Sequence, residues 1–150
     1  HFTIHSFPTR RSSDLVERVL RIALLHDVGE AVTTDLPRPV KQLLGRTAID
    51  RAELEAAEQV VGDADGWLDR VEEYQQKESP EARLVKAADR IQMLAKSLQY
   101  DQQKRGDVSE FWEENDALGR DWGFPVVNEI FERLEAKYRD GEWPPENTEG

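Results

Sequence analysis

Apolar side chains recur at helical spacing along nearly the whole chain, and no stretch alternates in the way that a half-buried strand requires. Val16, Val19, Leu20, Ala23 and Leu24 follow the i, i+3, i+4, i+7, i+8 pattern of one helical face, which we expect to be buried. The chain has 150 residues, the size of one ordinary domain, and contains no internal repeat. The pattern predicts an all-α fold.

Helix ends are marked most clearly at Ser79-Pro80-Glu81, where a capping side chain, a proline at the first helical position and an early acid coincide. We expect the helix that starts there to run to about Lys104, with Asp89 inside it. Gly29 and the β-branched stretch Val32-Thr33-Thr34 favour a break in the chain. The other expected helices are 16–25, 39–44, one from 47 or 50 to the stop at 62, 63–76, one from 107 or 109 to 118, and 124–138.

The formal net charge of -11 argues against nucleic acid as a partner, because non-specific binding to phosphate backbones needs a basic surface. A phosphate site on such a chain would need local cations or a metal ion. The absence of cysteine excludes a disulfide scaffold and a zinc-thiolate site. No apolar run is long enough to span a membrane and no secretory leader is recognisable, so we expect a soluble cytoplasmic protein.

Residues 5–15, HSFPTRRSSDL, resemble one reading frame of a common sequencing adapter. Eleven consecutive matches are hard to attribute to chance when each position has about one chance in twenty of agreeing. We therefore expect residues 1–15 to be non-native, residues 16–140 to form the domain, and residues 141–150 to be a frayed tail.

The residues best suited to chemistry are His26 and Asp27, which follow the first apolar helix, and Asp89, which lies beside an apolar stripe. An imidazole and adjacent carboxylate both ligate divalent metals, and near a helix end they can reach one ion. A carboxylate beside an apolar stripe, such as that of Asp89, is costly unless it is paired or binds a metal. The alternatives are a helix-terminal histidine with a solvated acid, and an ordinary ion pair from Asp89 to Lys86 or Arg90.

Two segments, ALLHDVGEAVTTDLPRPVK and EEYQQKESPEARLVKAADRIQML, resemble the HD-domain superfamily, and more narrowly its 5'-deoxynucleotidase branch. The first supplies the pattern HD-x-x-E followed after four residues by D-L-P, and the second supplies Lys86-x-x-Asp89. The resemblance extends from about Val16 to Gln103. Part of the family has a glutamate three residues after the aspartate that corresponds to Asp89, where this chain has Gln92.

The resemblance implies an HD-domain helical bundle in which two histidines and two aspartates hold one divalent ion, such as Mn, Co, Zn or Fe. His26, Asp27 and Asp89 would be three of these ligands. In the family the other histidine, together with an arginine, lies on an upstream helix that would precede Val16, so we expect a bundle that lacks its first helices. Loss of one ligand should impair metal binding and activity.

The expected activity is metal-dependent hydrolysis of nucleoside 5'-monophosphates, as the resemblance implies. Glu30 would orient or deprotonate the attacking water, and Asp35 would have a further catalytic role. Lys41 and Lys86 are nearby cations that could steady a phosphate, although solvated surface lysines are the commoner case. The resemblance also implies a homodimer.

Two alternatives stay open. The first is an HD phosphohydrolase that acts on another nucleotide, namely a triphosphate, a cyclic nucleotide or an alarmone. The second is a non-catalytic helical interaction module with Trp67, Trp112, Trp122 and Phe124 as anchors, although such aromatics more often belong to a core.

Overall fold

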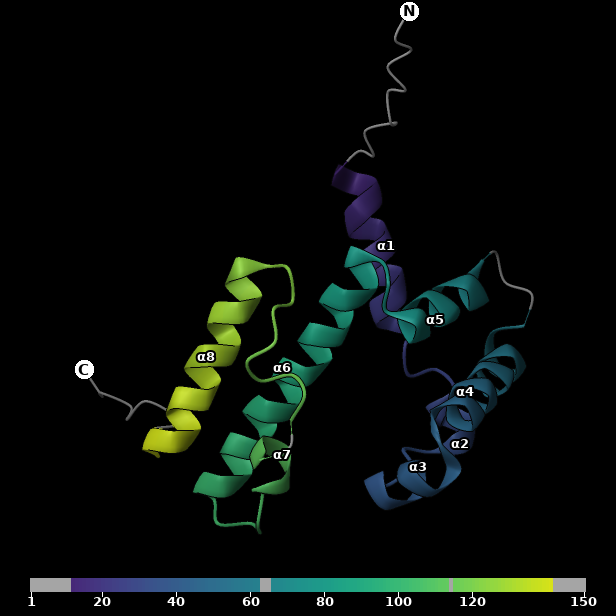
Figure 1. Ribbon diagram of the computed structural model, residues 1–150. Coiled ribbons are helices and arrows are strands. Elements are labelled where there is room, and N and C mark those ends of the chain that lie inside the picture. Colours follow the sequence, from purple (N-terminus) through teal and green to yellow (C-terminus); the bar gives the residue numbers. More distant parts are fainter. Residues whose placement is uncertain (1–11, 63–65, 114, 142–150) are drawn as a thin grey trace, which may run out of the picture. The chain divides into compact units, whose positions relative to one another are not determined.

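The computed structural model describes residues 12–62, 66–113 and 115–141. Every secondary-structure element assigned in these ranges is an α-helix (Figure 1). This confirms the all-α prediction. The expectations for residues 1–11 and 142–150 lie outside the described ranges, whereas residues 12–15 form the start of the first helix. The helices are α1 (Ser12–Leu25), α2 (Glu30–Thr33), α3 (Arg38–Leu44), α4 (Arg46–Val61), α5 (Trp67–Gln76), α6 (Pro80–Gln102), α7 (Glu110–Glu113) and α8 (Pro125–Asp140).

The predicted start of α6 is confirmed in atomic detail, because the Ser79 hydroxyl accepts a hydrogen bond from the Ala82 amide at 3.1 Å. Other boundaries differ from the prediction. The short helix α2 occupies the stretch where a break was expected, and α7 is much shorter than the predicted helix ending at residue 118. Helix α4 begins directly after Gly45, which has a φ of +75° and supplies no capping side chain. Local geometry at a glycine therefore replaced the expected cap at residue 47 or 50.

Residues 1–82 and 83–150 form two compact units. In the first unit α1 packs against α5, α4 packs against α5, and α2 and α3 pack against α4. Leu25, Ala57 and Val71 are buried together at the meeting point of α1, α4 and α5. This cluster fixes the carboxyl end of α1 against its neighbours, which matters because His26 follows directly.

The predicted buried face of α1 is wrong. Val16, Leu20 and Leu24 are 59%, 56% and 81% exposed, whereas Ile22 and Leu25 are 0% and 6% exposed. Helix α1 has apolar residues on two sides, and α5 packs on the side that the periodicity did not select.

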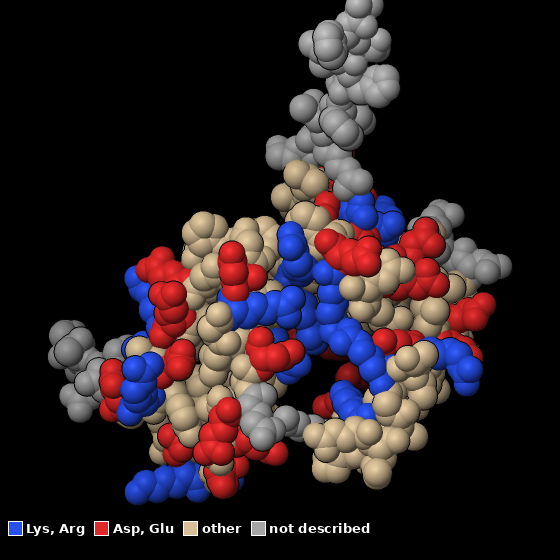
Figure 2. Space-filling model, viewed as in Figure 1, with Lys and Arg blue, Asp and Glu red and all other residues tan. Residues whose placement is uncertain are grey.

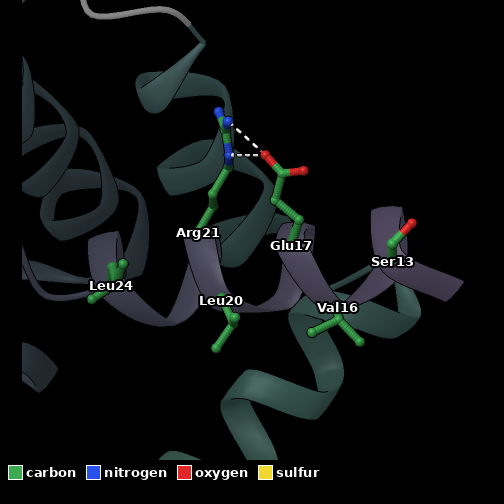
Figure 3. Close-up of a pocket in the computed structure, with 6 residues that line it drawn as sticks. All are labelled: Ser13, Val16, Glu17, Leu20, Arg21 and Leu24. Atoms are coloured by element: carbon green, nitrogen blue, oxygen red, sulfur yellow. Dashed lines mark hydrogen bonds and ion pairs between the residues drawn. The ribbon is translucent and has the colours of Figure 1, made fainter.

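The exposed stripe of α1 forms the floor of a shallow open depression. In Figure 3, Val16 and Leu20 point to one side of the helix, whereas Glu17 and Arg21 point to the other. These two charged side chains form an ion pair at 2.7 Å. The apolar stripe of Val16, Leu20 and Leu24 thus remains open to solvent in the described chain.

The core of the second unit is built from α6, α7 and α8. Its largest members are aromatic and aliphatic side chains, namely Leu94, Leu98, Trp112, Trp122, Phe131 and Leu134. The Trp112 ring stacks on Tyr138 with centroids 4.3 Å apart, and Trp122 stacks on Phe131 at 5.4 Å. These two tryptophans therefore belong to the core, as their type favours. Phe124 packs partly buried against the same cluster, and Trp67 in the first unit is 42% exposed.

Acidic and basic side chains both occupy the face shown in Figure 2, so the net charge of -11 is not spread as one uniform acidic surface. Within the described residues, no helix has the length and apolar character needed to cross a membrane.

Candidate metal and catalytic site

His26 and Asp27 lie in a tight turn that joins α1 to α2. The His26 amide still donates to the Ile22 carbonyl at 2.9 Å, and the Glu30 amide donates to the Asp27 carbonyl at 2.9 Å. Turn residues 26–29 separate α1 from α2. Side chains from neighbouring positions can converge there, as the sequence predicted for a helix end.

Gly29 is needed in this turn for a different reason from the one expected. Its φ of -65° and ψ of -28° are ordinary helical values, so no special backbone freedom is used. A Cβ atom at Gly29 would instead overlap the backbone carbonyl group of Glu53 in α4. The glycine therefore permits the close approach of the turn to α4.

The His26 imidazole is oriented by both of its nitrogens. Nδ1 lies 2.8 Å from the Ala23 carbonyl oxygen, and because a carbonyl only accepts, Nδ1 must donate its proton there. Nε2 lies 2.9 Å from Oδ2 of Asp27. In the neutral ring Nε2 is then an acceptor that faces a carboxylate oxygen, an arrangement that needs either a proton on Nε2 or a shared cation.

The positions of His26 Nε2 and Asp27 Oδ2 are compatible with two ligands of one metal ion. Two bonds of about 2.1 Å that meet at a right angle place their donor atoms roughly 3 Å apart, which is close to the separation of Nε2 and Oδ2. The hydrogen bond from Nδ1 to a backbone carbonyl is also the usual way in which a metal-binding histidine is held. His26 and Asp27 could therefore serve as two ligands of one ion.

Glu30, Asp35 and Lys41 lie close to this turn. Burial raises the pKa of Glu30, and the negative charges of Asp27 and Asp35 raise it further. Lys41 donates to Asp35 at 3.0 Å. Burial by itself would lower the pKa of Lys41, but this hydrogen bond and the surrounding carboxylates outweigh it, so the pKa is raised. Lys41 is thus a firmly charged cation beside the predicted catalytic acids.

Asp89 lies on α6 in the second unit. Its Oδ2 atom is 2.7 Å from Nζ of Lys86, with the two side chains 33% and 19% exposed. The ion pair between Asp89 and Lys86, which the sequence analysis gave as an alternative to metal binding, is therefore formed. Among the described residues, no group of three or more His, Cys, Asp and Glu side chains is arranged to hold a metal ion.

Two neighbours of the site were not singled out from the sequence. The Tyr74 ring meets the His26 ring edge to face, with centroids 5.0 Å apart. Next to it, the buried carboxylate of Glu73 accepts hydrogen bonds from Arg18, Arg70 and Ser79. Tyr74 is far from His26 in the sequence, and Arg18 is 55 residues from Glu73, so periodicity gave no signal for either contact.

The family model described as HD domain matches residues 5–120. The chain therefore belongs to the HD-domain family, which confirms the resemblance. It is also similar to the 5'-deoxynucleotidase HDDC2 of Danio rerio, with 31% identity over 103 aligned residues that cover 64% of this chain and 50% of that protein. The chain thus spans about half the length of this relative. No solved structure matches the chain significantly.

Proposed function

We propose that this chain carries the catalytic centre of a metal-dependent phosphohydrolase that acts on nucleoside 5'-monophosphates. The observation that carries the proposal is the pair of His26 Nε2 and Asp27 Oδ2, which face each other at 2.9 Å beside Glu30. Membership of the HD-domain family and the similarity to a 5'-deoxynucleotidase support the same reaction class.

In this proposal His26, Asp27 and Asp89 are ligands of one divalent ion, for which Mn, Co, Zn and Fe suit the mixed nitrogen and oxygen donors. Such an ion, when bound, polarises a phosphoryl oxygen and lowers the pKa of its water towards about 7. The family's ligand set includes a second histidine, which we propose is supplied from outside this chain. The 150-residue chain should then be an impaired form of the enzyme.

The side chains around the turn have separate roles. Glu30 takes the proton of the attacking water, and its raised pKa brings it closer to the pH at which a general base is most effective. Asp35, held by Lys41, acts on the sugar or on the leaving 5'-oxygen. Lys41 and Lys86 contribute positive charge for the phosphate in an otherwise acidic protein.

The test is phosphate release from a panel of deoxynucleoside monophosphates, with a triphosphate, a cyclic nucleotide and an alarmone included, in the presence of each metal. We expect slow release from monophosphates that is lost in His26→Ala and Asp27→Asn and retained in Glu132→Gln, a change of an exposed acid on α8. Release equal to that of His26→Ala, with every metal and in a chain extended upstream, would refute the proposal. A preference for another nucleotide would keep the reaction class and change the substrate.

The resemblance also leads us to propose a cytoplasmic homodimer. Light scattering on the purified chain measures whether it is a dimer.

A further inference from the structure

The His26 side chain is contacted both by residues near it in the sequence and by a residue of α5. Within α1, the Ala23 carbonyl accepts the Nδ1 proton at 2.8 Å. From α5, the ring of Tyr74 packs against the imidazole at an interplanar angle of 68°. The contacts at Nδ1 and Nε2 lie along the ring edge, whereas an aromatic wall beside the ring restricts its rotation out of that plane.

Tyr74 is itself firmly placed. Its side chain is buried, with 8% of the residue exposed, and Val71 one turn earlier is buried with Leu25 of α1. Nε of Arg18 donates hydrogen bonds to both carboxylate oxygens of the adjacent Glu73, at 2.9 Å and 3.0 Å. Arg18 and Leu25 are seven residues apart and so lie on one side of α1. The contacts Arg18–Glu73 and Leu25–Val71 thus fix α1 against α5 within one helical turn of Tyr74.

We propose that Tyr74 is a positioning residue for His26. Its ring holds the imidazole in the orientation in which Nδ1 donates to Ala23 and Nε2 is presented beside Asp27. The consequence for metal binding rests on the proposed function, but the orientation of the ring in the metal-free chain does not. Residues that orient a histidine ligand typically change metal affinity by about 10- to 100-fold when removed.

The contrast between Tyr74→Phe and Tyr74→Leu isolates the ring. Phenylalanine keeps the aromatic wall and loses the hydroxyl, whereas leucine fills part of the space without an aromatic face. We expect Tyr74→Phe to bind Mn²⁺ and Co²⁺ as wild type does, and Tyr74→Leu to bind them at least about tenfold more weakly by calorimetry. Tyr138→Leu, which removes a partly buried stacked ring from the other unit, is the matched control and should leave metal affinity unchanged.

Nitrogen NMR of the metal-free chain gives a readout that needs neither activity nor metal. The chain has three histidines, and His26→Gln assigns the signal of interest. At about pH 8.5, where an ordinary imidazole is neutral and the exposed Asp27 carboxylate can turn away from Nε2 into water, we expect His26 to be mainly the Nδ1–H tautomer in wild type and Tyr74→Phe. In Tyr74→Leu we expect a mixture with the Nε2–H tautomer. Far-ultraviolet circular dichroism establishes that each variant is folded.

A nuclear Overhauser contact between the Tyr74 and His26 rings in the wild-type chain covers the case in which Tyr74→Leu does not fold, and its absence would overturn the proposal. An unchanged tautomer in folded Tyr74→Leu would also overturn the proposal. So would a loss of metal affinity in Tyr74→Phe equal to that in Tyr74→Leu, since the hydroxyl rather than the ring would then be responsible. If neither the wild-type chain nor a chain extended upstream binds metal, but the expected tautomers are seen, the proposed function is refuted and the positioning role of Tyr74 stands.

Discussion

Replacing Arg18 by methionine tests what holds α1 to the rest of the first unit. The Arg18 guanidinium makes a bidentate contact with Glu73, and the two side chains are 25% and 10% exposed. Methionine keeps most of the apolar stem and removes the charge and the donors. The change leaves the Glu73 carboxylate with two partners, Arg70 at 2.6 Å and Ser79 at 2.5 Å.

The expected loss of stability follows from these contacts. Hydrogen bonds to a charged group are worth about 1.5–3 kcal/mol, and breaking a fully buried pair costs about 3–5 kcal/mol. Because a quarter of Arg18 is exposed and Glu73 keeps two partners, we expect about 2 kcal/mol at neutral pH. Backbone amides of α1 and α5 should then exchange with deuterium about 30-fold faster, since 1.4 kcal/mol corresponds to a factor of ten.

The loss should depend on pH. Burial alone would raise the pKa of Glu73, but the hydrogen bonds from Arg18 and Ser79 and the nearby positive charges outweigh it, so the pKa is lowered from 4.5. The stabilisation by the ionised carboxylate is complete above about pH 4.5 and is lost as the pH falls through the lower folded-state value. The difference between wild type and Arg18→Met should therefore shrink in acid.

The matched control is Arg21→Met on the same helix, which breaks an exposed pair with Glu17 and should cost about 0.3–0.5 kcal/mol. Urea unfolding followed by far-ultraviolet circular dichroism, at about pH 7 and about pH 3, measures both variants. Equal effects of the two substitutions at neutral pH would refute the reasoning. A loss for Arg18→Met that does not change with pH would show that packing, rather than the ion pair, is at stake.

Four further predictions concern the site and the start of the chain. Gly29→Ala should destabilise the fold by about 1–3 kcal/mol in urea, because the added methyl overlaps the backbone of α4; a neutral change would contradict that close approach. Asp89→Asn should cost at most about 0.5 kcal/mol of stability, since its pair with Lys86 is partly solvated, yet reduce metal-dependent phosphate release at least about tenfold. Glu30→Gln should lower kcat by about 100-fold or more and remove the acidic limb of the pH profile. In wild type the midpoint of that limb should lie above the ordinary carboxyl pKa, because the pKa of Glu30 is raised. An unaltered profile would exclude Glu30 as the base. Resequencing the genomic locus should find no codons for residues 5–15 upstream of Val16, and finding them would disprove the adapter hypothesis.

The sequence predicted those parts of the fold that depend on neighbouring residues. The start of α6 was predictable because Ser79, Pro80 and Glu81 act on the same few backbone groups. Periodicity identified α1 as a helix but could not choose its buried side, since Ile22 and Leu25 compete with Val16, Leu20 and Leu24 for the same partner. That choice depends on α5, which comes later in the chain and packs on α1.

The candidate site divides in the same way. His26, Asp27, Glu30 and Asp35 were recognisable because their spacing is local and matches a family pattern. The contact of Tyr74 with His26 was not recognisable, because it joins residues that are far apart in the sequence and rests on the packing of two helices. Gly29 was expected only to favour a break in the chain, whereas its role in the close approach to the carbonyl of Glu53 depends on another helix.

The aromatic stacks of the second unit have a consequence for spectroscopy. Trp112 and Trp122 are shielded from water, whereas Trp67 is 42% exposed, so among the described tryptophans the large emission shift on unfolding will come from residues 83–150. A fluorescence-monitored denaturation curve would therefore report mainly on the half of the chain that does not contain His26. Loss of structure around the histidine could pass unnoticed by this probe, and a tryptophan at Tyr74 or another reporter in the first unit would be needed to see it.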